Sequence, residues 1–558
     1  MLGLAAAVML GIAGNSGAAG VPTDIVIEPA VVVLPLGART KLGFQFGPVD
    51  GVMGGVKEGP NQYRFFGSGE SLTTTACPGT PGVQGVYAFT ADLSTSPPGF
   101  TSGCTALLQP SGPLVETGIV GSFDRNYLGG GPTMRVTHPD GRRGVLLVYH
   151  AEVQWYDDGP CASGTTLCFY GTLGMAFSSD DGATFQKLGL IIQSHISRAT
   201  FHTAPYLGGN VPIGNGPIVV GDAAGNAVDP RTVNPSQTYV YVFYIDNQED
   251  LGAADPCAPG KACLAVARAL LSDVIEAAFN LDGVALSGLF QKYYNGGFAV
   301  PAAPPDPNGT LPTNNAGPYT PLLKGAFSPS ALYDSATRQV ILASVTAGQI
   351  QLRVSHNLLD WSQPPVATLS EAPPFAEIRY PSLIGELEDA NVGGGQPWLF
   401  YSREPPDGTW PQTELMVARL QVSGPPLSLV TRANQTMFAV GQTLDVTVGL
   451  INPGLPGSVD VYAGFLSPNN SIHFFTSAGI VVGNPSDLAS FPRLATGVAL
   501  ETPFSVTVPD FYSHKWTGSE PRGTWLFFLA VVNADALAGG TLPEASIVGL
   551  ASASFSFP

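Results

Sequence analysis

Charged residues are scarce in this chain, and that scarcity excludes several classes of protein. Only 12% of the 558 residues are Asp, Glu, Lys or Arg, too few for long amphipathic helices with solvated faces. The charge that is present is acidic, with 42 Asp and Glu against 24 Lys and Arg and a formal net charge of -18. No run of Lys or Arg offsets this excess, so the chain would repel a phosphate backbone, and nucleic acid is not an expected partner.

The motifs of several enzyme classes are also missing. The sequence contains no GxSxG nucleophile elbow, no HExxH zinc motif and no Gly-rich phosphate loop that opens a helix. Its six cysteines form no CxxC pair, and none has a histidine at ligand spacing, which argues against a zinc centre. We therefore expect neither a metal nor a cofactor.

The cysteines fall instead into three pairs that are close in sequence, each bounded by Gly, Pro or Ser. Many pairings are open to six cysteines, but short loop staples are the simplest in an oxidising compartment. The expected disulfides are Cys77–Cys104, Cys161–Cys168 and Cys257–Cys263.

Residues 1–20 have the pattern of a signal peptide. An apolar stretch through Ile12 is followed by small residues suited to cleavage near Ala18 or Ala19. The usual positive charges before the apolar stretch are missing, and an apolar N-terminal strand is the alternative. Beyond this segment no uncharged run is long enough to span a bilayer. We expect a secreted, periplasmic or extracellular protein.

Glycine and proline, in contrast, are abundant, with 68 and 50 residues, and 44% of the chain is hydrophobic. This mixture is typical of many short strands joined by tight turns, and the length favours two or three domains. We expect an all-β chain. Residues 21–56 lead into a repeat-built domain at 57–423, and a second β domain follows at 427–558.

One pattern recurs between residues 63 and 422: a strand entered by polar residues, a turn, and a hydrophobic, aromatic-rich strand. Five such repeats predict a β-propeller with five blades, and six blades are the alternative. The expected first strands are 63–69, 131–138, 201–208, 327–334 and 379–386. The expected second strands are 85–93, 144–153, 239–247, 339–347 and 397–404. Only residues 272–280 look helical.

Two turns carry a family feature. The segment Ser178–Phe185 (SSDDGATF) matches the Asp-box pattern Ser-x-Asp-x-Gly-x-Thr-aromatic, and Ser355–Trp361 is a degraded copy. In this pattern Asp caps backbone donors of a hairpin, Gly takes a positive φ, and the aromatic ring tucks under the blade. The box is therefore structural. The chain resembles sialidase-like and related glycosidase propellers, a resemblance that implies the fold and an action on glycans.

The composition changes after residue 422. A linker at Gly424–Pro426 leads into segments with period-two hydrophobicity, which predict an immunoglobulin-like β-sandwich without the intersheet disulfide. The region resembles accessory modules of bacterial secreted proteins, and the likeness lies in Val440–Gln442 and Asn452–Gly454. Such a module implies spacing or docking at a cell surface.

A propeller gathers the starts of its first strands and the ends of its second strands at one end of a central channel. Charged and imidazole side chains occupy these positions in the predicted blades, with Asp246 and Glu404 among them. Glycoside hydrolysis needs two carboxyl groups. The candidate catalytic residues are Asp124, Glu152 and Glu377. The candidate substrate-binding residues are Tyr127, His150, Arg198, His202 and Arg379.

Each candidate has a structural alternative. Asp124 could cap a turn, and His150 and Glu152, which share one strand face by alternation, could simply bond to each other. Glu377 and Arg379 could form an ordinary ion pair. By the same reasoning Asp246 is expected to cap a turn, and Arg198 and His202 could make hydrogen bonds between blades.

Two functions from different classes remain open. A sialidase would imply an early Arg-Ile-Pro motif, which is absent, since the first predicted blade has Tyr63-Arg64-Phe65. The five-bladed arabinanase, xylosidase and fructosidase group would imply carboxylates from three early blades, of which Asp124 or Glu152 could supply one. The chain is thus predicted to be a secreted propeller that resembles glycoside hydrolases, or a noncatalytic propeller that binds carbohydrate or protein.

Overall fold

The computed structural model describes most of the chain from residue 23 onward. The described residues are 23–35, 44–46, 51–71, 84–95, 98–111, 123–155, 168–195, 210–211, 213–214, 216–246, 263–303, 317–371, 377–404, 413–423, 428–452, 458–500, 504–538, 540 and 546–558. They belong to two compact units, one spanning Ile25–Val422 and the other holding Ser423–Pro558. Within these ranges no helix combines the length and the apolar character needed to cross a membrane.

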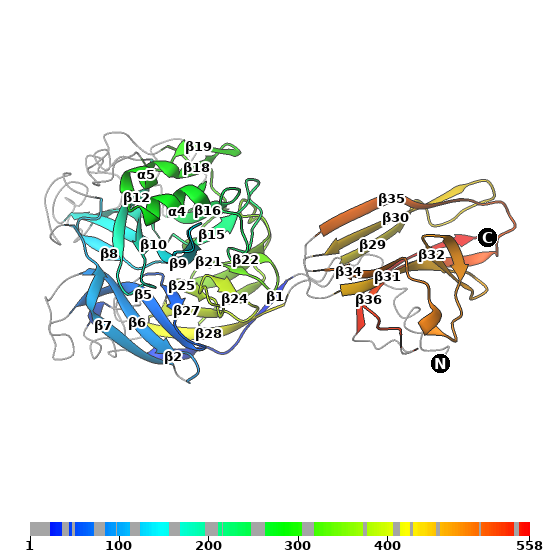
Figure 1. Ribbon diagram of the computed structural model, residues 1–558, viewed down its shortest axis with the longest axis horizontal. Helices are drawn as coiled ribbons and strands as arrows, with labels where there is room; N and C mark the ends of the chain where they lie inside the picture. Colours follow the sequence, from blue (N-terminus) through cyan, green and yellow to red (C-terminus); the bar gives the residue numbers. More distant parts are fainter. Residues whose placement is uncertain are drawn as a thin grey trace. The chain divides into compact units, whose positions relative to one another are not determined.

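Five sheets make up the described part of the first unit, and Figure 1 shows them around a common centre. The first sheet contains β3 (Phe44–Phe46), β4 (Gly54–Lys57), β5 (Gln62–Ser71), β6 (Gln84–Asp92) and β7 (Gly99–Leu108). The second contains β8 (Tyr127–Gly129), β9 (Thr133–Thr137), β10 (Arg143–Trp155), β11 (Cys168–Ser178), β12 (Gln186–Ile192) and β13 (Asn210–Val211).

The third sheet contains β14 (Ile213–Gly214), β15 (Ile218–Gly221), β16 (Tyr239–Asp246), β17 (Cys263–Leu270), β18 (Gln291–Tyr294), β19 (Gly297–Pro301) and β20 (Leu323–Lys324). The fourth contains β21 (Phe327–Asp334), β22 (Gln339–Thr346), β23 (Gln349–Ser355), β24 (Ala367–Leu369) and β26 (Val392–Gly393). The fifth joins β25 (Ile378–Ile384), β27 (Trp398–Arg403) and β28 (Glu414–Ser423) to β1 (Asp24–Ile27) and β2 (Val31–Leu34).

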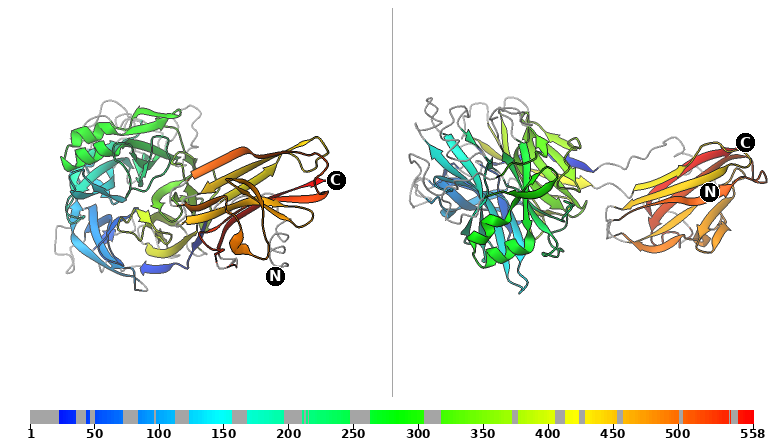
Figure 2. Two further views of the ribbon diagram at one scale, coloured as in Figure 1. Left: turned by 45° about the vertical axis from the view of Figure 1, so that its right-hand side comes forward. Right: turned by 90° about the horizontal axis from the view of Figure 1, so that it is seen from above.

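The innermost strands of the five sheets close a ring. Strand β4 contacts β9, β9 contacts β15, β15 contacts β21, β21 contacts β25, and β25 contacts β4 again. Figure 2 shows the same arrangement from two further directions. Strands β1 and β2, from the start of the described chain, pair with β28 near the end of this unit, so the last sheet is completed by the first strands. A ring of sheets closed in this way is a β-propeller.

Hydroxyl groups connect neighbouring inner strands. The Gly55 amide donates to Thr133 Oγ1 over 3.1 Å, and the Met53 amide donates to Ser382 Oγ over 2.9 Å. The Leu383 amide likewise donates to Ser330 Oγ over 2.9 Å. Each accepting hydroxyl follows a proline in the sequence, as in Pro-Thr or Pro-Ser. These bonds satisfy backbone donors at the crowded centre, where water has little access.

The second strands are buried on both faces because a sheet packs on each side of them. In β16, Val242 and Tyr244 belong to the core shared with the second sheet, whereas Tyr241 and Phe243 belong to the core shared with the fourth. Continuous hydrophobic runs are therefore expected in such strands, and the sequence has them. This packing explains why the aromatic-rich segments were the clearest signal of the repeat.

The first sheet corrects the predicted strand register. Residues 63–69 were expected to form its first strand and 85–93 its second, but β5 and β6 occupy the second and third places. The first place belongs to β4, the short segment Gly-Gly-Val-Lys, which pairs with β5. Four residues with two glycines have no hydrophobic period that sequence reasoning could detect.

Two other expectations need comment. The predicted strand at 201–208 lies outside the described residues, and the segments that pair with the inner side of β16 are β14 and β15. The predicted helix at 272–280 corresponds to α4 (Leu271–Phe279), and a second helix, α5 (Gly283–Leu289), was not predicted. The Asp282 side chain caps α5 by accepting from the Ala285 amide.

Of the six cysteines, Cys263 at the start of β17 is disulfide-bonded. Its expected partner Cys257 lies outside the described residues, as do Cys77 and Cys161. The three pairings therefore remain predictions.

The hairpin between β11 and β12 is held by one carboxylate. Asp180 Oδ1 accepts from the Thr184 amide over 2.9 Å, and its Oδ2 accepts from the Thr184 hydroxyl over 2.7 Å. Gly182 has a φ of 82°, and the Phe185 ring packs edge-on against Phe66 of the neighbouring sheet. The second copy follows the same plan, since the Asn357 side chain accepts from the Leu359 amide and Trp361 packs against Phe243.

Replacing Asp180 by Ala should lower the free energy of unfolding by about 1 kcal/mol, because three local donors, two on Thr184 and the Ser178 hydroxyl, lose their acceptor. Ligand binding should not change, since Asp180 is exposed on this outer hairpin. Ser179→Ala, one residue away and also exposed, is the matched control. Urea unfolding of both variants measures the difference, and equal stabilities would show that the carboxylate does not stabilise the hairpin.

The second unit consists of two sheets in its described part. One contains β29 (Ser428–Ala433), β30 (Thr443–Asn452) and β35 (Phe504–Lys515). The other contains β31 (Ser458–Leu466), β32 (Ile472–Thr476), β33 (Gly479–Val482), β34 (Ala495–Ala499), β36 (Gly523–Asn533) and β37 (Ile547–Phe557). A single core takes side chains from both, including Val446 of β30, Phe465 of β31 and Phe527 of β36. The unit is thus a β-sandwich.

Candidate functional site

Three acidic side chains are buried near the ends of second strands in three different sheets. Glu152 lies on β10, Asp246 ends β16, and Glu404 follows β27, with exposed fractions of 8%, 0% and 9%. Each second strand runs antiparallel to the inner strand beside it, so these three residues share the end of the ring at which the inner strands begin. Burying a carboxylate is costly unless it is bonded, which makes this concentration informative.

Glu152 is fixed by two neighbours on its own strand. Its Oε1 lies 2.9 Å from His150 Nε2, and its Oε2 accepts from Gln154 Nε2 over 2.7 Å. The three side chains share one face of β10 because strand residues alternate. The His150 and Glu152 side chains keep 16% and 10% of their surface exposed, so the pair is within reach of a ligand. Alternation in the sequence predicted this pairing of His150 with Glu152.

Aromatic rings and glycines enclose the imidazole. Tyr127 of β8 and Phe169 of β11 meet the His150 ring edge-on, with centroids 6.1 and 6.3 Å away. A Cβ on Gly171 would lie 2.9 Å from His150 Cε1, so the backbone approaches the ring too closely for any side chain. His150 Nδ1 is buried and has no hydrogen-bond partner among the described residues. A close-fitting wall therefore fixes the orientation of the ring.

Glu404 lies in an ion-pair network with two candidate residues. Arg379 Nη2 pairs with the Glu377 carboxylate and lies 3.5 Å from Glu404 Oε1. The Glu377 side chain is 51% exposed, and its backbone oxygen accepts from the Glu404 amide over 2.9 Å. The structure thus brings Glu377 and Arg379 together, and it places Glu404, not Glu377, in the buried position.

The charge of Asp246 acts on a buried lysine. Lys292 of β18 is fully buried and donates to the backbone oxygens of Gln193, over 2.7 Å, and Gly317, over 3.0 Å. Burial lowers the pKa of Lys292 to about 8, and the negative charge of Asp246 opposes this shift. Burial, followed by the charge of Lys292, lowers the pKa of His195 to about 4. These groups form a polar cluster between the second and third sheets.

Asp124 is not part of this site. Its Oδ2 accepts from Lys187 Nζ and its Oδ1 from the Ser111 hydroxyl, each over 2.6 Å. Its charge also raises the pKa of Tyr149, after the larger effect of burial. Tyr149 points to the opposite face of β10 from Glu152, since Tyr149 packs in the core shared with the first sheet. The two predicted catalytic residues Asp124 and Glu152 are therefore not brought together, because their side chains lie on opposite sides of β10.

Arg198 and His202 lie outside the described residues, so their expected place in the site remains a prediction. Sequence reasoning overlooked Lys292, His195 and Gln154. Lys292 follows the two helices inserted after β17, where the strand repeat offers no guide. A signal was nevertheless present, because a lone cation occurs between Phe290 and Tyr293 in a chain with few cations.

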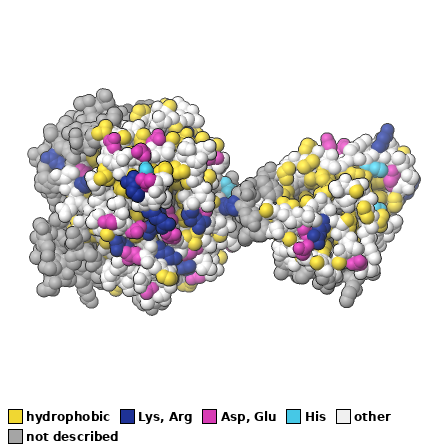
Figure 3. All heavy atoms as spheres, in the orientation of Figure 1, with side chains coloured by type: hydrophobic (Ala, Val, Ile, Leu, Met, Phe, Trp, Pro, Cys, Tyr) yellow, Lys and Arg dark blue, Asp and Glu magenta, His cyan; other side chains and the backbone are white. Residues whose placement is uncertain are grey.

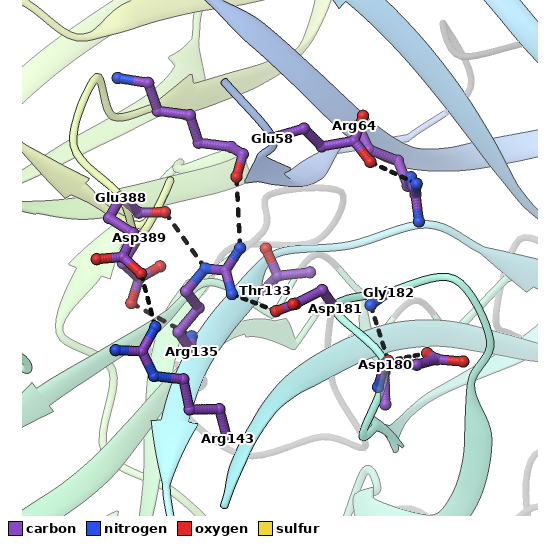
Figure 4. Close-up of polar contacts among 12 residues, drawn as sticks. Glu58, Arg64, Thr133, Arg135, Arg143, Asp180, Asp181, Gly182, Glu388 and Asp389 are labelled. Atoms are coloured by element: carbon purple, nitrogen blue, oxygen red, sulfur yellow. Dashed lines mark hydrogen bonds and ion pairs between the residues drawn. The ribbon is translucent and has the colours of Figure 1, made fainter. Parts of the chain in front are cut away.

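The opposite end of the ring carries a second group of charges, shown in Figure 4. The Arg135 guanidinium pairs with Asp181 and donates to the backbone oxygen of Glu388 over 3.3 Å, while Arg143 pairs with the Glu388 side chain over 3.0 Å. Figure 3 shows Lys and Arg side chains beside Asp and Glu over the middle of the first unit. A cavity of about 640 Å³ opens here, lined in part by Arg135, Arg143 and Asp389. Because these cations already have acidic partners, this end is best explained as structural.

Asp389 gives this end a pH dependence that can be measured. Burial raises its pKa to about 6 from 3.8, and hydrogen bonds from the Asn391 and Arg135 amides oppose the shift. Between these two values the folded chain binds more protons than the unfolded chain, so this group makes stability fall as pH rises. Asp389→Asn should remove that fall. Relative to wild type, the variant should gain about 2 kcal/mol between pH 4 and pH 6.

Urea unfolding of both proteins across that pH range tests this. His195 contributes a rise in stability with pH over part of the same window, because its pKa is lowered, but this contribution cancels between wild type and variant. A pH-independent difference between the two proteins would contradict the assignment. A constant stability offset added to the pH-dependent difference would report a hydrogen bond that the carboxylate accepts in the wild type and that the amide does not accept.

The ring of sheets and the buried acids at one end define the first unit as a β-propeller with a candidate ligand site at that end. No protein-family model matches the chain, and no curated protein matches it. Among solved structures, it is similar to a family 117 glycoside hydrolase of the marine bacterium Zobellia galactanivorans, with 10% identity, 72% of this chain and 90% of that chain covered, and a TM-score of 0.35.

Two further similarities are of the same kind. A putative glycoside hydrolase of Bacteroides ovatus shares 12% identity over 70% of this chain and 96% of its own, with a TM-score of 0.33. A family 32 β-fructofuranosidase of Bombyx mori shares 8% identity over 92% of this chain and 94% of its own, with a TM-score of 0.31. These values carry no argument about activity, which must rest on the site.

Proposed function

We propose that this chain is an exported glycoside hydrolase, a five-bladed propeller in which each of the five sheets is one blade. The observation that carries the proposal is the set of buried acids from three sheets at one end of the ring. Glycoside hydrolysis requires a pair of carboxyl groups held on opposite sides of a sugar, and a ring of blades can supply them from separate strands.

Glu152 and Glu404 are the proposed catalytic pair. Both retain some exposed side-chain surface, 10% and 11%, whereas Asp246 is fully buried. His150 and Gln154 position Glu152, and Arg379 positions Glu404. Tyr127, and Arg198 and His202 from their undescribed segment, are proposed to contact the sugar. Glu377 is exposed, and its proposed role is to hold Arg379 in place through their ion pair.

The alternative function is a noncatalytic propeller that binds a glycan or protein. One observation favours it, namely that Glu377 and Glu404 both interact with Arg379 and so are partly neutralised. The bonds of Glu152 favour hydrolysis, because its partners are an imidazole and an amide and not a guanidinium. An acid held by groups of this kind can still exchange a proton.

A glycan library incubated with the purified full chain tests the two functions. Release of reducing sugar or of a smaller oligosaccharide supports hydrolysis. Binding without turnover favours the alternative, and the absence of both rejects a glycan-directed function.

We further propose that the chain is exported and that its second unit is an immunoglobulin-like accessory module. The disulfide of Cys263 supports export, since such bonds persist in oxidising compartments. Sequencing the N-terminus of the mature protein would locate the cleavage near Ala18 or Ala19. An uncleaved Met1 would argue against it.

A further inference from the structure

The second unit contains a small aromatic pocket of its own. The cavity measures about 150 Å³ and is lined by Tyr512, His514, Trp516, Trp525, His473 and Glu520, with a few aliphatic and Phe neighbours. All of these residues belong to the sandwich, so the pocket does not depend on the propeller. Its volume suits one small ring and not an extended ligand.

Aromatic rings give the pocket flat, fixed walls. The rings of Tyr512 and His514 are parallel within 7°, at a centroid distance of 6.2 Å. The Trp516 ring stands at 88° to His514 and at 69° to Trp525, with centroids 5.2 and 5.7 Å away. Trp525 Nε1 donates to the Pro521 backbone oxygen over 3.0 Å, which holds its ring in place. These walls offer apolar faces without needing to move.

Trp516 supplies a donor that the described protein does not use. The residue is 2% exposed and stacks on Phe557, with centroids 4.5 Å apart. Its Nε1 is buried and has no hydrogen-bond partner among the described residues. A buried donor left unbonded is destabilising, so a ligand oxygen that reached Trp516 Nε1 through the pocket wall would be bound more tightly. The pocket therefore selects a ligand that carries acceptors.

The acidic residue of the pocket is already committed to the protein. Glu520 accepts from the Thr517 hydroxyl and the Gly518 amide, each over 2.8 Å, and from His514 Nε2 over 3.0 Å. Burial would raise the pKa of Glu520, but hydrogen bonds, first of all from the Thr517 amide, bring it down to about 2. The Glu520 carboxylate is thus already hydrogen-bonded to Thr517 and Gly518, just before it in the chain, and to His514. An aromatic cage binds a quaternary ammonium group through the faces of its rings. Such a group carries no acceptor for Trp516 Nε1, so the cage does not explain this donor.

We propose that this pocket binds one sugar ring of a glycan, so that the second unit is a carbohydrate-binding module separate from the propeller site. The apolar face of the sugar packs on Trp525 and Tyr512, and a sugar oxygen accepts from Trp516 Nε1. A sugar combines an apolar ring face with acceptor oxygens, which is the combination that these walls and this donor require.

The test begins with a glycan array probed with the full chain carrying Glu152→Gln, which prevents turnover from consuming a substrate. The best array glycan is then titrated by calorimetry into this protein and into pocket variants. Trp525→Ala should weaken binding by about tenfold or more, because it removes a stacking wall. Trp516→Phe keeps the ring and deletes only the donor, and should weaken binding by about three- to tenfold.

Two controls make the result specific. Val482→Ala changes a residue that is 64% exposed on β33 and does not line the pocket, so affinity should be unchanged. Thermal unfolding of every variant shows whether the sandwich stays folded, and Trp516→Phe provides the readout if Trp525→Ala unfolds. Failure of this proposal leaves the propeller proposal intact, because the residues tested belong to different units.

Three outcomes would overturn the inference. One is an array on which no glycan binds, and another is binding that neither tryptophan variant weakens. The third is binding of choline that displaces the glycan and disappears in Glu520→Gln, which would identify the pocket as a cation cage.

Discussion

Replacing Glu152 by Gln is expected to lower glycan turnover by about two to four orders of magnitude, the range typical of a lost general acid or base. Gln has the size of Glu and can still accept from His150 or Gln154, so the loss should fall on kcat more than on substrate affinity. Initial rates on the best substrate of the library give kcat and KM separately. Glu404→Gln should produce a loss of similar size.

The two variants combined should be little slower than either alone, because residues that act as a unit are not additive. Asp124→Asn is the matched control, since it also removes one buried carboxylate, but one that lies before β8 on the side of β10 where Tyr149 packs. It should reduce stability by about 1–3 kcal/mol through the lost partner of Lys187 and leave kcat unchanged. A large fall in kcat for Asp124→Asn with none for Glu152→Gln would reverse our assignment.

The part of the site that the sequence predicted is the part that depends on strand alternation. His150 and Glu152 share a face because β10 is a long regular strand, and their pairing needed no knowledge of the neighbouring sheets. Gln154 lies on the same face by the same alternation but was overlooked. Asp124 was misplaced because it lies in an irregular segment before β8, where alternation gives no direction for the side chain. The choice between Glu377 and Glu404 depended on which of them is buried, and burial is set by packing.

The same distinction holds for the fold. The all-β class and the aromatic second strands follow from composition and period, and the structure confirms the all-β class. Inner strands were harder to predict, because their register depends on contacts between sheets far apart in sequence. Gly54 and Gly55 form half of β4, yet in the sequence they resemble a turn. Only the ring explains why glycine is needed there.

Replacing Gly54 by Ala should destabilise the propeller by about 3 kcal/mol or more, an overpacking cost at a site that cannot relax. A Cβ there would lie 2.3 Å from the Gly131 backbone oxygen and 2.7 Å from Pro132 Cα and Thr133 N. All three atoms are backbone of the next blade at the centre of the ring, so no side chain can move aside. Gly99→Ala is the matched control, because a Cβ at that strand start meets nothing within 4 Å. Urea unfolding should show a large loss for Gly54→Ala and little change for Gly99→Ala, and equal stabilities would mean that the inner strands are not packed in a closed ring.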